Sequence, residues 1–171
     1  LPPFPSSLLS NPELESCEII EGKLEQLPDW TKPYPKLTKV DLSWNKLKSL
    51  PKGWNNVPNL QEFSCCDNEI TQIPDSLASC VELESMDFSQ NPLEETPTWI
   101  CNLPKVTRLH LSELPVREDL HIPDHITDID LEGCKLSTLP SSILSLQTLK
   151  SLSLKNNLFT TVPESLLSLV Q

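Results

Sequence analysis

The chain has 171 residues, of which 37% are hydrophobic, and its formal net charge is -11 at pH 7. This length is enough for one domain with a sizeable core. The strong negative charge argues against nucleic acid and anionic membrane as partners, because both are bound through basic surfaces, and it favours a neutral or basic protein partner. No apolar stretch reaches the roughly 18 residues that span a bilayer. With one Tyr, four Phe and four Trp, the core is expected to be mainly aliphatic.

A repeat runs along the whole chain and is marked by its prolines. Pro5, Pro28, Pro51, Pro74 and Pro97 are 23 residues apart, and a fixed period of this length is typical of solenoid proteins. Around them the sequence follows the frame LxxLxLxxNxLxxLP, for example LTKVDLSWNKLKSLP from residue 37 and LKSLSLKNNLFTTVP from residue 149. Frames start at residues 14, 37, 60, 83, 106, 126 and 149, and residues 1–13 form a partial repeat.

The elements expected along the chain recur in every frame. Alternation of apolar and polar residues in the LxL segment predicts short strands at 17–19, 40–42, 63–65, 86–88, 109–111, 129–131 and 152–154, paired in one parallel sheet. After the LP pair, an apolar spacing of three residues, as in Leu77, Cys80 and Leu83, predicts a short helical return on the outer face. The frame from residue 106 is only 20 residues long, so its return is expected to lose its helical turn between Glu118 and His125.

Seven such frames in register resemble the leucine-rich repeat (LRR) family, and the resemblance covers essentially the whole chain. It implies a single α/β domain over residues 1–171, a curved horseshoe-shaped solenoid with a parallel β-sheet on the concave face and short helices or turns on the convex face. The ninth frame position resembles the family's buried asparagine ladder at Asn45, Asn68, Asn91 and Asn157. Cys134 is an accepted substitute in this ladder, whereas Gly22 and Leu114 depart from it.

The positions of the six cysteines do not indicate a disulfide scaffold. Four occupy apolar or ladder positions of the frame, namely Cys17, Cys65, Cys80 and Cys134. Cys66 is expected on the concave face and Cys101 on the outer face, too far apart to bridge. Because no cysteine-rich cap and no Asn-x-Ser/Thr sequon is present, an intracellular, cytoplasmic site of action is expected.

The third, fifth, seventh and eighth frame positions are expected to line the concave face, with seven strands giving a surface roughly 30 Å long, which is the scale of a protein partner. Trp44 is the one aromatic residue among them and is predicted to be an anchor, although it could instead lie against its neighbours. The acidic column formed by Glu18, Asp41, Asp87 and Asp130 at the fifth frame position either receives basic side chains of a partner or is a solvated face. Predicted partner-binding residues are Glu18, Lys39, Asp41, Trp44, Glu62, Cys66, Asp67, Asp87, Gln90, Arg108, His110, Glu113, Asp130 and Glu132.

Two groups of histidines have residue types that could form an enzymatic or metal site. His110 shares the fifth frame position with Asp87 and Asp130 on neighbouring strands, which could bind a metal or polarise a general base, but an open sheet offers no enclosed pocket and no oxyanion site. His121 and His125 are four residues apart, but Pro123 between them disfavours the helix that would bring both to one metal ion. No catalytic residue, metal or cofactor is therefore predicted.

The function expected from the sequence is a protein-interaction module that binds a protein partner on its concave surface. The short frame, with Ile122-Pro123, partly resembles the repeats of secreted bacterial effectors, including ubiquitin-ligase effectors, which would place the protein in the host cytoplasm. The alternative is the substrate-selecting or autoinhibitory arm of a larger signalling enzyme or ubiquitin ligase. Both chain ends fall inside a repeat, so a longer or capped natural protein is expected. The oligomeric state is left open.

Overall fold

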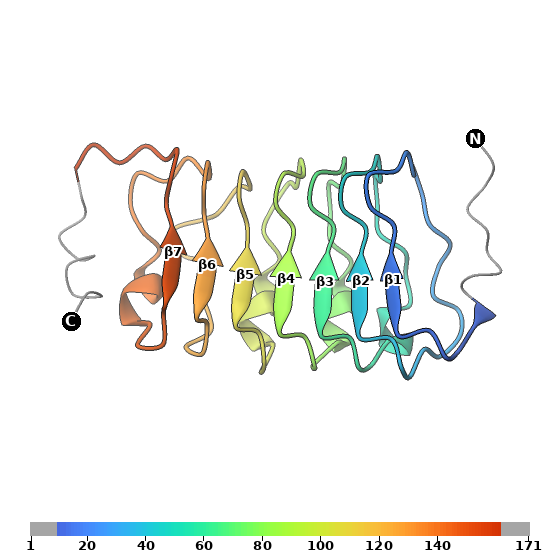
Figure 1. The fold of residues 1–171 in the computed structure, drawn as a ribbon. Coiled ribbons are helices and arrows are strands. Elements are labelled where there is room, and N and C mark those ends of the chain that lie inside the picture. Colours follow the sequence, from blue (N-terminus) through green and yellow to red (C-terminus); the bar gives the residue numbers. More distant parts are fainter. Residues whose placement is uncertain (1–9, 162–171) are drawn as a thin grey trace.

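Every LxL segment forms a three-residue strand, displaced by one residue toward the N-terminus from the predicted range. The computed structural model describes residues 10–161; residues 1–9 of the predicted partial repeat and 162–171 of the last frame lie outside the described residues. The strands are β1 (Ser16–Glu18), β2 (Lys39–Asp41), β3 (Glu62–Ser64), β4 (Ser85–Asp87), β5 (Arg108–His110), β6 (Asp128–Asp130) and β7 (Ser151–Ser153). They pair in parallel and in chain order, so each repeat lies beside the repeats that precede and follow it (Figure 1).

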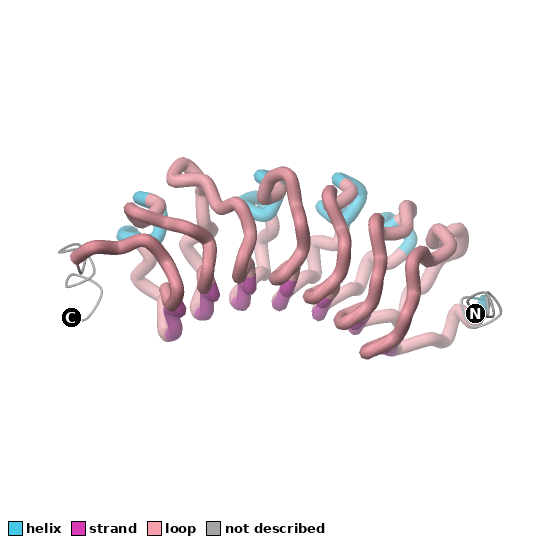
Figure 2. The backbone as a smooth tube through the Cα atoms, turned by 90° about the horizontal axis from the view of Figure 1, so that it is seen from above, coloured by secondary structure: helices cyan, strands magenta, loops and turns pink. Residues whose placement is uncertain are grey.

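The array bends into a shallow arc, with the strands on its inner side and the helical segments on its outer side (Figure 2). The helices are short 3-10 segments, η2 (Trp54–Asn56), η3 (Asp75–Ser79), η4 (Thr98–Asn102) and η5 (Ser141–Ser145). Because a return that contains a helix is wider than a strand, stacking the repeats curves the sheet inward. The predicted LRR horseshoe is therefore confirmed. None of the helices of residues 10–161 is long and apolar enough to cross a membrane.

Two returns within the described residues have no helix. The return between β5 and β6 has none, as the 20-residue frame predicted. The return between β1 and β2 also lacks one, which the frame length did not indicate. Where a helix is present, the residues predicted three apart in the return belong to the core. Around η3 these are Leu77, Cys80 and Leu83, and all three are fully buried.

The expectation of a mainly aliphatic core is incomplete, because six aromatic rings form a continuous row through the N-terminal repeats. Successive ring centroids are separated by 5.2, 5.6, 5.0, 5.9 and 6.4 Å in the order Tyr34, Trp30, Trp54, Phe63, Phe88 and Trp99. Most of these contacts are edge-to-face, a geometry that adds about 0.5–1.5 kcal/mol to each pair beyond area burial. The aromatic row therefore ties the first four repeats together.

The predicted asparagine ladder is confirmed. The Asn68 amide donates to the carbonyl oxygens of Leu42 and Cys65 at 3.0 Å each, and its Oδ1 accepts the backbone N–H of Leu47 at 2.9 Å. Asn45, Asn91 and Asn157 repeat this pattern. At the same position Cys134 donates to the Leu111 carbonyl at 3.1 Å, whereas the apolar side chain of Leu114 has no group that could donate. The ladder is therefore weakest around the irregular repeat.

Candidate functional site: the concave surface

The concave surface consists of the third and fifth residues of each frame, which lie on the strands, together with the turn residues that follow. In β2 the middle residue, Val40, is buried, whereas Lys39 and Asp41 on either side of it are partly exposed. The same alternation holds in β3 to β6. The register aligns the fifth residues into one column across the sheet, made of Glu18, Asp41, Ser64, Asp87, His110, Asp130 and Ser153.

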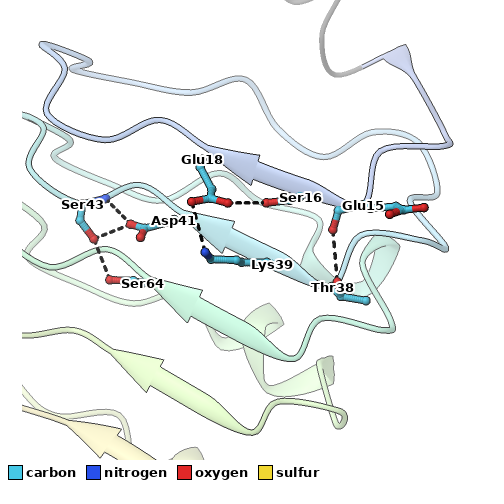
Figure 3. Close-up of polar contacts among 8 residues, drawn as sticks. All are labelled: Glu15, Ser16, Glu18, Thr38, Lys39, Asp41, Ser43 and Ser64. Carbon is cyan, nitrogen blue, oxygen red and sulfur yellow. Dashed lines mark hydrogen bonds and ion pairs between the residues drawn. The ribbon is translucent and has the colours of Figure 1, made fainter.

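Both cations on the concave strands pair with glutamates. Lys39 Nζ lies 3.2 Å from Glu18 Oε2, and Arg108 reaches across β4 to Glu62 at 3.7 Å. A hydrogen bond from Ser16 and then the pairing with Lys39 lower the pKa of the Glu18 carboxyl, and the same pairing raises the pKa of Lys39 (Figure 3). Such exposed pairs add little stability. Their main effect is to neutralise the only positive charges on the strands.

The column aspartates shape the turns that follow their strands. Asp41 Oδ1 accepts the Ser43 N–H at 3.0 Å and the Ser43 hydroxyl at 2.6 Å (Figure 3). Asp87 accepts the N–H of Ser89 at 2.9 Å, and Asp130 accepts the N–H of Glu132 at 3.0 Å. Among residues 10–161 none of these three aspartates forms a salt bridge. These bonds engage Oδ1 of each carboxylate and give it a structural role that the sequence did not indicate.

At the seventh frame position two serines differ from the prediction. Ser43 and Ser89 were expected to be exposed, but both are buried. The Ser43 hydroxyl lies 2.7 Å from the Ser64 hydroxyl, and the Ser89 hydroxyl accepts the Ser112 N–H at 3.1 Å. The turn therefore folds these small polar side chains inward, where they link neighbouring repeats.

The eighth frame position has a left-handed backbone in every repeat. These residues, which we call the rim, are Glu21, Trp44, Asp67, Gln90, Glu113, Gly133 and Asn156, with φ of 55°, 60°, 53°, 55°, 62°, 68° and 54°. For a residue with a Cβ this conformation costs roughly 1–2 kcal/mol. Glycine or asparagine would relieve that cost, yet Trp44 retains a large side chain there. Five of the seven rim residues are exposed to solvent, namely Glu21, Trp44, Gln90, Glu113 and Asn156.

Two apolar residues, one on the rim and one beside it, are open to solvent. Trp44 is 53% exposed and Ile20, at the seventh position of the preceding repeat, is 44% exposed. The repeats are linked beside them by the Glu21 N–H, which donates to the Ser43 carbonyl at 3.2 Å. About half of the Trp44 side chain thus remains available for contact with another molecule.

The predicted site residues all lie on the concave strands or in the turns after them, but they differ in exposure. The exposed ones are Glu18, Trp44, Glu62, Gln90, Arg108 and Glu113. The half-buried ones are Lys39, Asp41, Cys66, Asp67, Asp87, His110, Asp130 and Glu132. Ile20 was not among the predicted partner-binding residues but belongs to the same surface. An apolar residue is unusual at the seventh frame position, and this is the signal that could have identified it.

The histidines do not come together. The register places His110 between Asp87 and Asp130, as predicted. His125 Nε2 lies 3.1 Å from the Leu103 carbonyl, and His121 is exposed on the return. In the part of the chain that the structure describes, no group of three or more His, Cys, Asp or Glu side chains is arranged to hold a metal ion.

All six cysteines are free thiols, and three of them are buried. Desolvation raises the pKa of Cys17, Cys65, Cys66 and Cys134, and it raises the pKa of Cys80 to about 12. Because the thiolate is the reactive form, these groups are poor nucleophiles at neutral pH.

We expect the free energy of unfolding to fall as the pH rises from about 9 toward about 12, because Cys80 keeps its proton in the folded chain and loses it in the unfolded chain. The stabilising contribution is complete below the pKa of the unfolded thiol and is lost as the pH rises through the folded value. Denaturant unfolding across this pH range measures the effect, and Cys80→Ala should flatten the profile. An identical alkaline slope in the variant would assign the loss of stability to other groups.

Comparisons with known proteins agree with this geometry. The leucine rich repeat family models match residues 35–93 and 148–169. An LRR protein of Leptospira interrogans is 26% identical, with a TM-score of 0.51 and coverage of 80% of this chain and 36% of that one. The LRR ectodomain of the Arabidopsis thaliana receptor kinase GASSHO1/SCHENGEN3, in complex with Casparian strip integrity factor 2, is 27% identical, with a TM-score of 0.64 and coverage of 90% and 19%.

A third structure, that of TLR13 in a complex with the RNA ssRNA13, is 22% identical and shares the fold with a TM-score of 0.74, covering 96% of this chain and 24% of that one. The chain thus spans well under half the length of these structures. A search of curated protein sequences found no significant match. The repeated frame, the buried amide ladder, the parallel concave sheet and the family matches together show that the chain is a leucine-rich repeat protein.

Proposed function

We propose that this chain is a protein-interaction module that binds a protein partner on its concave surface. LRR domains commonly mediate protein–protein interaction. The observation that carries the proposal is the uncovered sheet face, because no helix or loop of residues 10–161 lies in front of the seven strands (Figure 2). This face presents charged side chains and the half-exposed Trp44, and a broad open surface of this kind suits a protein better than a metabolite.

The similar structures support a protein ligand for this chain. The GASSHO1/SCHENGEN3 ectodomain is bound to Casparian strip integrity factor 2, and a fold neighbour, Toll, is in a complex with Spatzle. TLR13 is bound to RNA, but the net charge of -11 and the pairing of Lys39 and Arg108 with glutamates disfavour a phosphate backbone here. The proposed partner is therefore a neutral or basic protein rather than nucleic acid or membrane, and the module itself performs no catalysis.

We further propose that the module works in a reducing, intracellular compartment, which is supported by six free thiols distributed between core and surface. We also propose that the chain is the recognition domain of a bacterial effector that acts in a host cytoplasm. The 20-residue repeat, which has no helix and contains Ile122-Pro123, supports this proposal. The alternative is the substrate-selecting or autoinhibitory arm of a larger signalling enzyme or ubiquitin ligase.

Neutralising the aspartate column tests the proposed surface. In the triple variant Asp41→Asn, Asp87→Asn and Asp130→Asn each asparagine retains an Oδ1 that can accept the turn N–H, so the fold is kept while three charges are removed. We expect at least about tenfold weaker binding of a basic partner and a smaller dependence of its affinity on salt. Proteins captured from lysate by the unaltered chain are compared with those captured by the variant, and their affinities are then measured by calorimetry.

The matched control removes three exposed carboxylates away from the concave strands, in Glu25→Gln, Glu69→Gln and Asp124→Asn. This control should leave binding unchanged. Equal affinity and equal salt dependence for the unaltered chain, the column variant and the control would reject the concave surface as the partner site.

A further inference from the structure

The charges of the chain are strongly segregated along the array. Every charged side chain between residues 53 and 104 is acidic, namely Glu62, Asp67, Glu69, Asp75, Glu82, Glu84, Asp87, Glu94 and Glu95. Among the described residues, only Glu62 and Glu82 of this group form salt bridges, with Arg108 and Lys105. The repeats that carry β3 and β4 therefore have an uncompensated negative potential, which attracts a cation of a partner.

The rim has an open hollow in this acidic part. Asp67, Gln90 and Glu113, from three successive repeats, line it together with Asn91 and Pro92, and its volume is about 440 Å³. Neither Asp67 nor Glu113 forms a salt bridge within residues 10–161. A guanidinium or ammonium group placed over Gln90 would lie between two carboxylates held by the left-handed rim backbone.

An exposed apolar patch lies next to this hollow. Trp44 is the rim residue of the repeat immediately before that of Asp67, and Ile20 belongs to the repeat before that of Trp44. Tryptophan is the residue most often found as an energetic anchor of protein interfaces, and charged groups around an anchor select the partner. The apolar patch and the acidic hollow thus lie next to each other, and together they span five consecutive turns, from that of Ile20 to that of Glu113.

We infer that this part of the rim docks one protein segment that carries an apolar side chain for Ile20 and Trp44 and a Lys or Arg for the hollow between Asp67 and Glu113. The inference rests on the proposed function and adds the chemistry of the partner, and charge complementarity identifies that partner as basic. From Trp44 to Gln90 is two strand steps, or about 10 Å. In a polyproline II segment, residues three apart face the same side and are separated by about 9 Å. A segment that docks in this conformation and fills both parts of the site therefore has an apolar residue and a basic residue three positions apart.

Short random peptides displayed on phage are the probe for this inference. Selection on the unaltered chain should enrich peptides with a large apolar residue followed three positions later by Lys or Arg. Trp44→Ala, and separately the pair Asp67→Asn and Glu113→Gln, should each weaken the selected peptides by at least about tenfold. Because Trp44 is 53% exposed and does not belong to the buried core, circular dichroism of each variant should show the fold retained.

Matched controls lie on the same molecule. Leu158→Ala removes another exposed apolar side chain, which is 61% exposed, and Glu69→Gln with Glu94→Gln removes two acidic charges from the same repeats outside the hollow. These controls should keep the affinity of the selected peptides within about twofold, since they leave both parts of the docking site unchanged.

The remaining outcomes separate this inference from the proposed function. Absence of enrichment, or enriched peptides without a basic residue, overturns the inference. Peptides that lose affinity only in the Asp41, Asp87 and Asp130 variant also overturn it but leave the proposed concave site standing. Peptides that bind every variant as tightly as they bind the unaltered chain overturn both.

Discussion

Alanine in place of Asn68 is expected to lower the free energy of unfolding by about 3 kcal/mol, because it leaves buried backbone groups without partners. The lost bonds are those to the carbonyl oxygens of Leu42 and Cys65 and the one from the Leu47 N–H, all within 3.0 Å. They join two neighbouring repeats in the interior, where water cannot replace them. Urea unfolding followed by circular dichroism measures the difference.

The chain itself supplies a graded comparison for Asn68. Cys134 occupies the same ladder position and donates to the Leu111 carbonyl at 3.1 Å, so Asn68→Cys should cost less than Asn68→Ala. Asn55→Ala, at an exposed position outside the ladder, should have little effect. If Asn68→Ala proved as mild as Asn55→Ala, the ladder would contribute little to the stability of the array.

Much of the fold could be predicted from the sequence because the frame repeats. One short LxL segment fits several structures, but seven in register can bury their apolar residues together only by stacking as parallel strands. The same argument places Asn68 inside, since an amide recurring after each strand is positioned to bond the turns. The one-residue displacement of the strands shows that the frame locates an element better than its ends.

The turn geometry could not be predicted in the same way. Residue types at the eighth position give a mixed signal for its left-handed backbone. Trp44, Gln90 and Glu113 do not favour this conformation, whereas Asp67, Gly133 and Asn156 do. The inward placement of Ser43 and Ser89 depends on this turn. The alternation of the strand therefore predicts the third and fifth positions of the candidate surface but not the turn positions that follow them.

The row of aromatic rings was also missed, for a different reason. Trp30, Trp54 and Trp99 belong to the returns, whereas Phe63 and Phe88 belong to the strand segments, so no single frame position contains them all. Composition showed that aromatic residues are few, but it cannot show that they meet. Their contact depends on how the returns pack against the sheet, which is a property of the tertiary structure.

Trp54→Ala is expected to lower the free energy of unfolding by about 4 kcal/mol, a cost typical of removing a large ring from a core. Trp54 is fully buried, and its ring contacts Trp30 at 5.6 Å and Phe63 at 5.0 Å between centroids. Since each repeat contacts only its neighbours, the loss should be concentrated in the first repeats. Hydrogen exchange should therefore show weakened protection around β1 to β3 before it does so around β5 to β7.

Two variants distinguish loss of packing from loss of a tryptophan. Trp54→Phe keeps a ring in the row and removes an indole N–H that has no hydrogen-bond partner in the structure, so it should cost less than Trp54→Ala. Trp44→Ala removes the same side chain from a site that is 53% exposed and should change stability by less than about 1 kcal/mol. Equal destabilisation by Trp44→Ala and Trp54→Ala, or uniform loss of protection along the array, would show that the aromatic row does not hold the N-terminal repeats together.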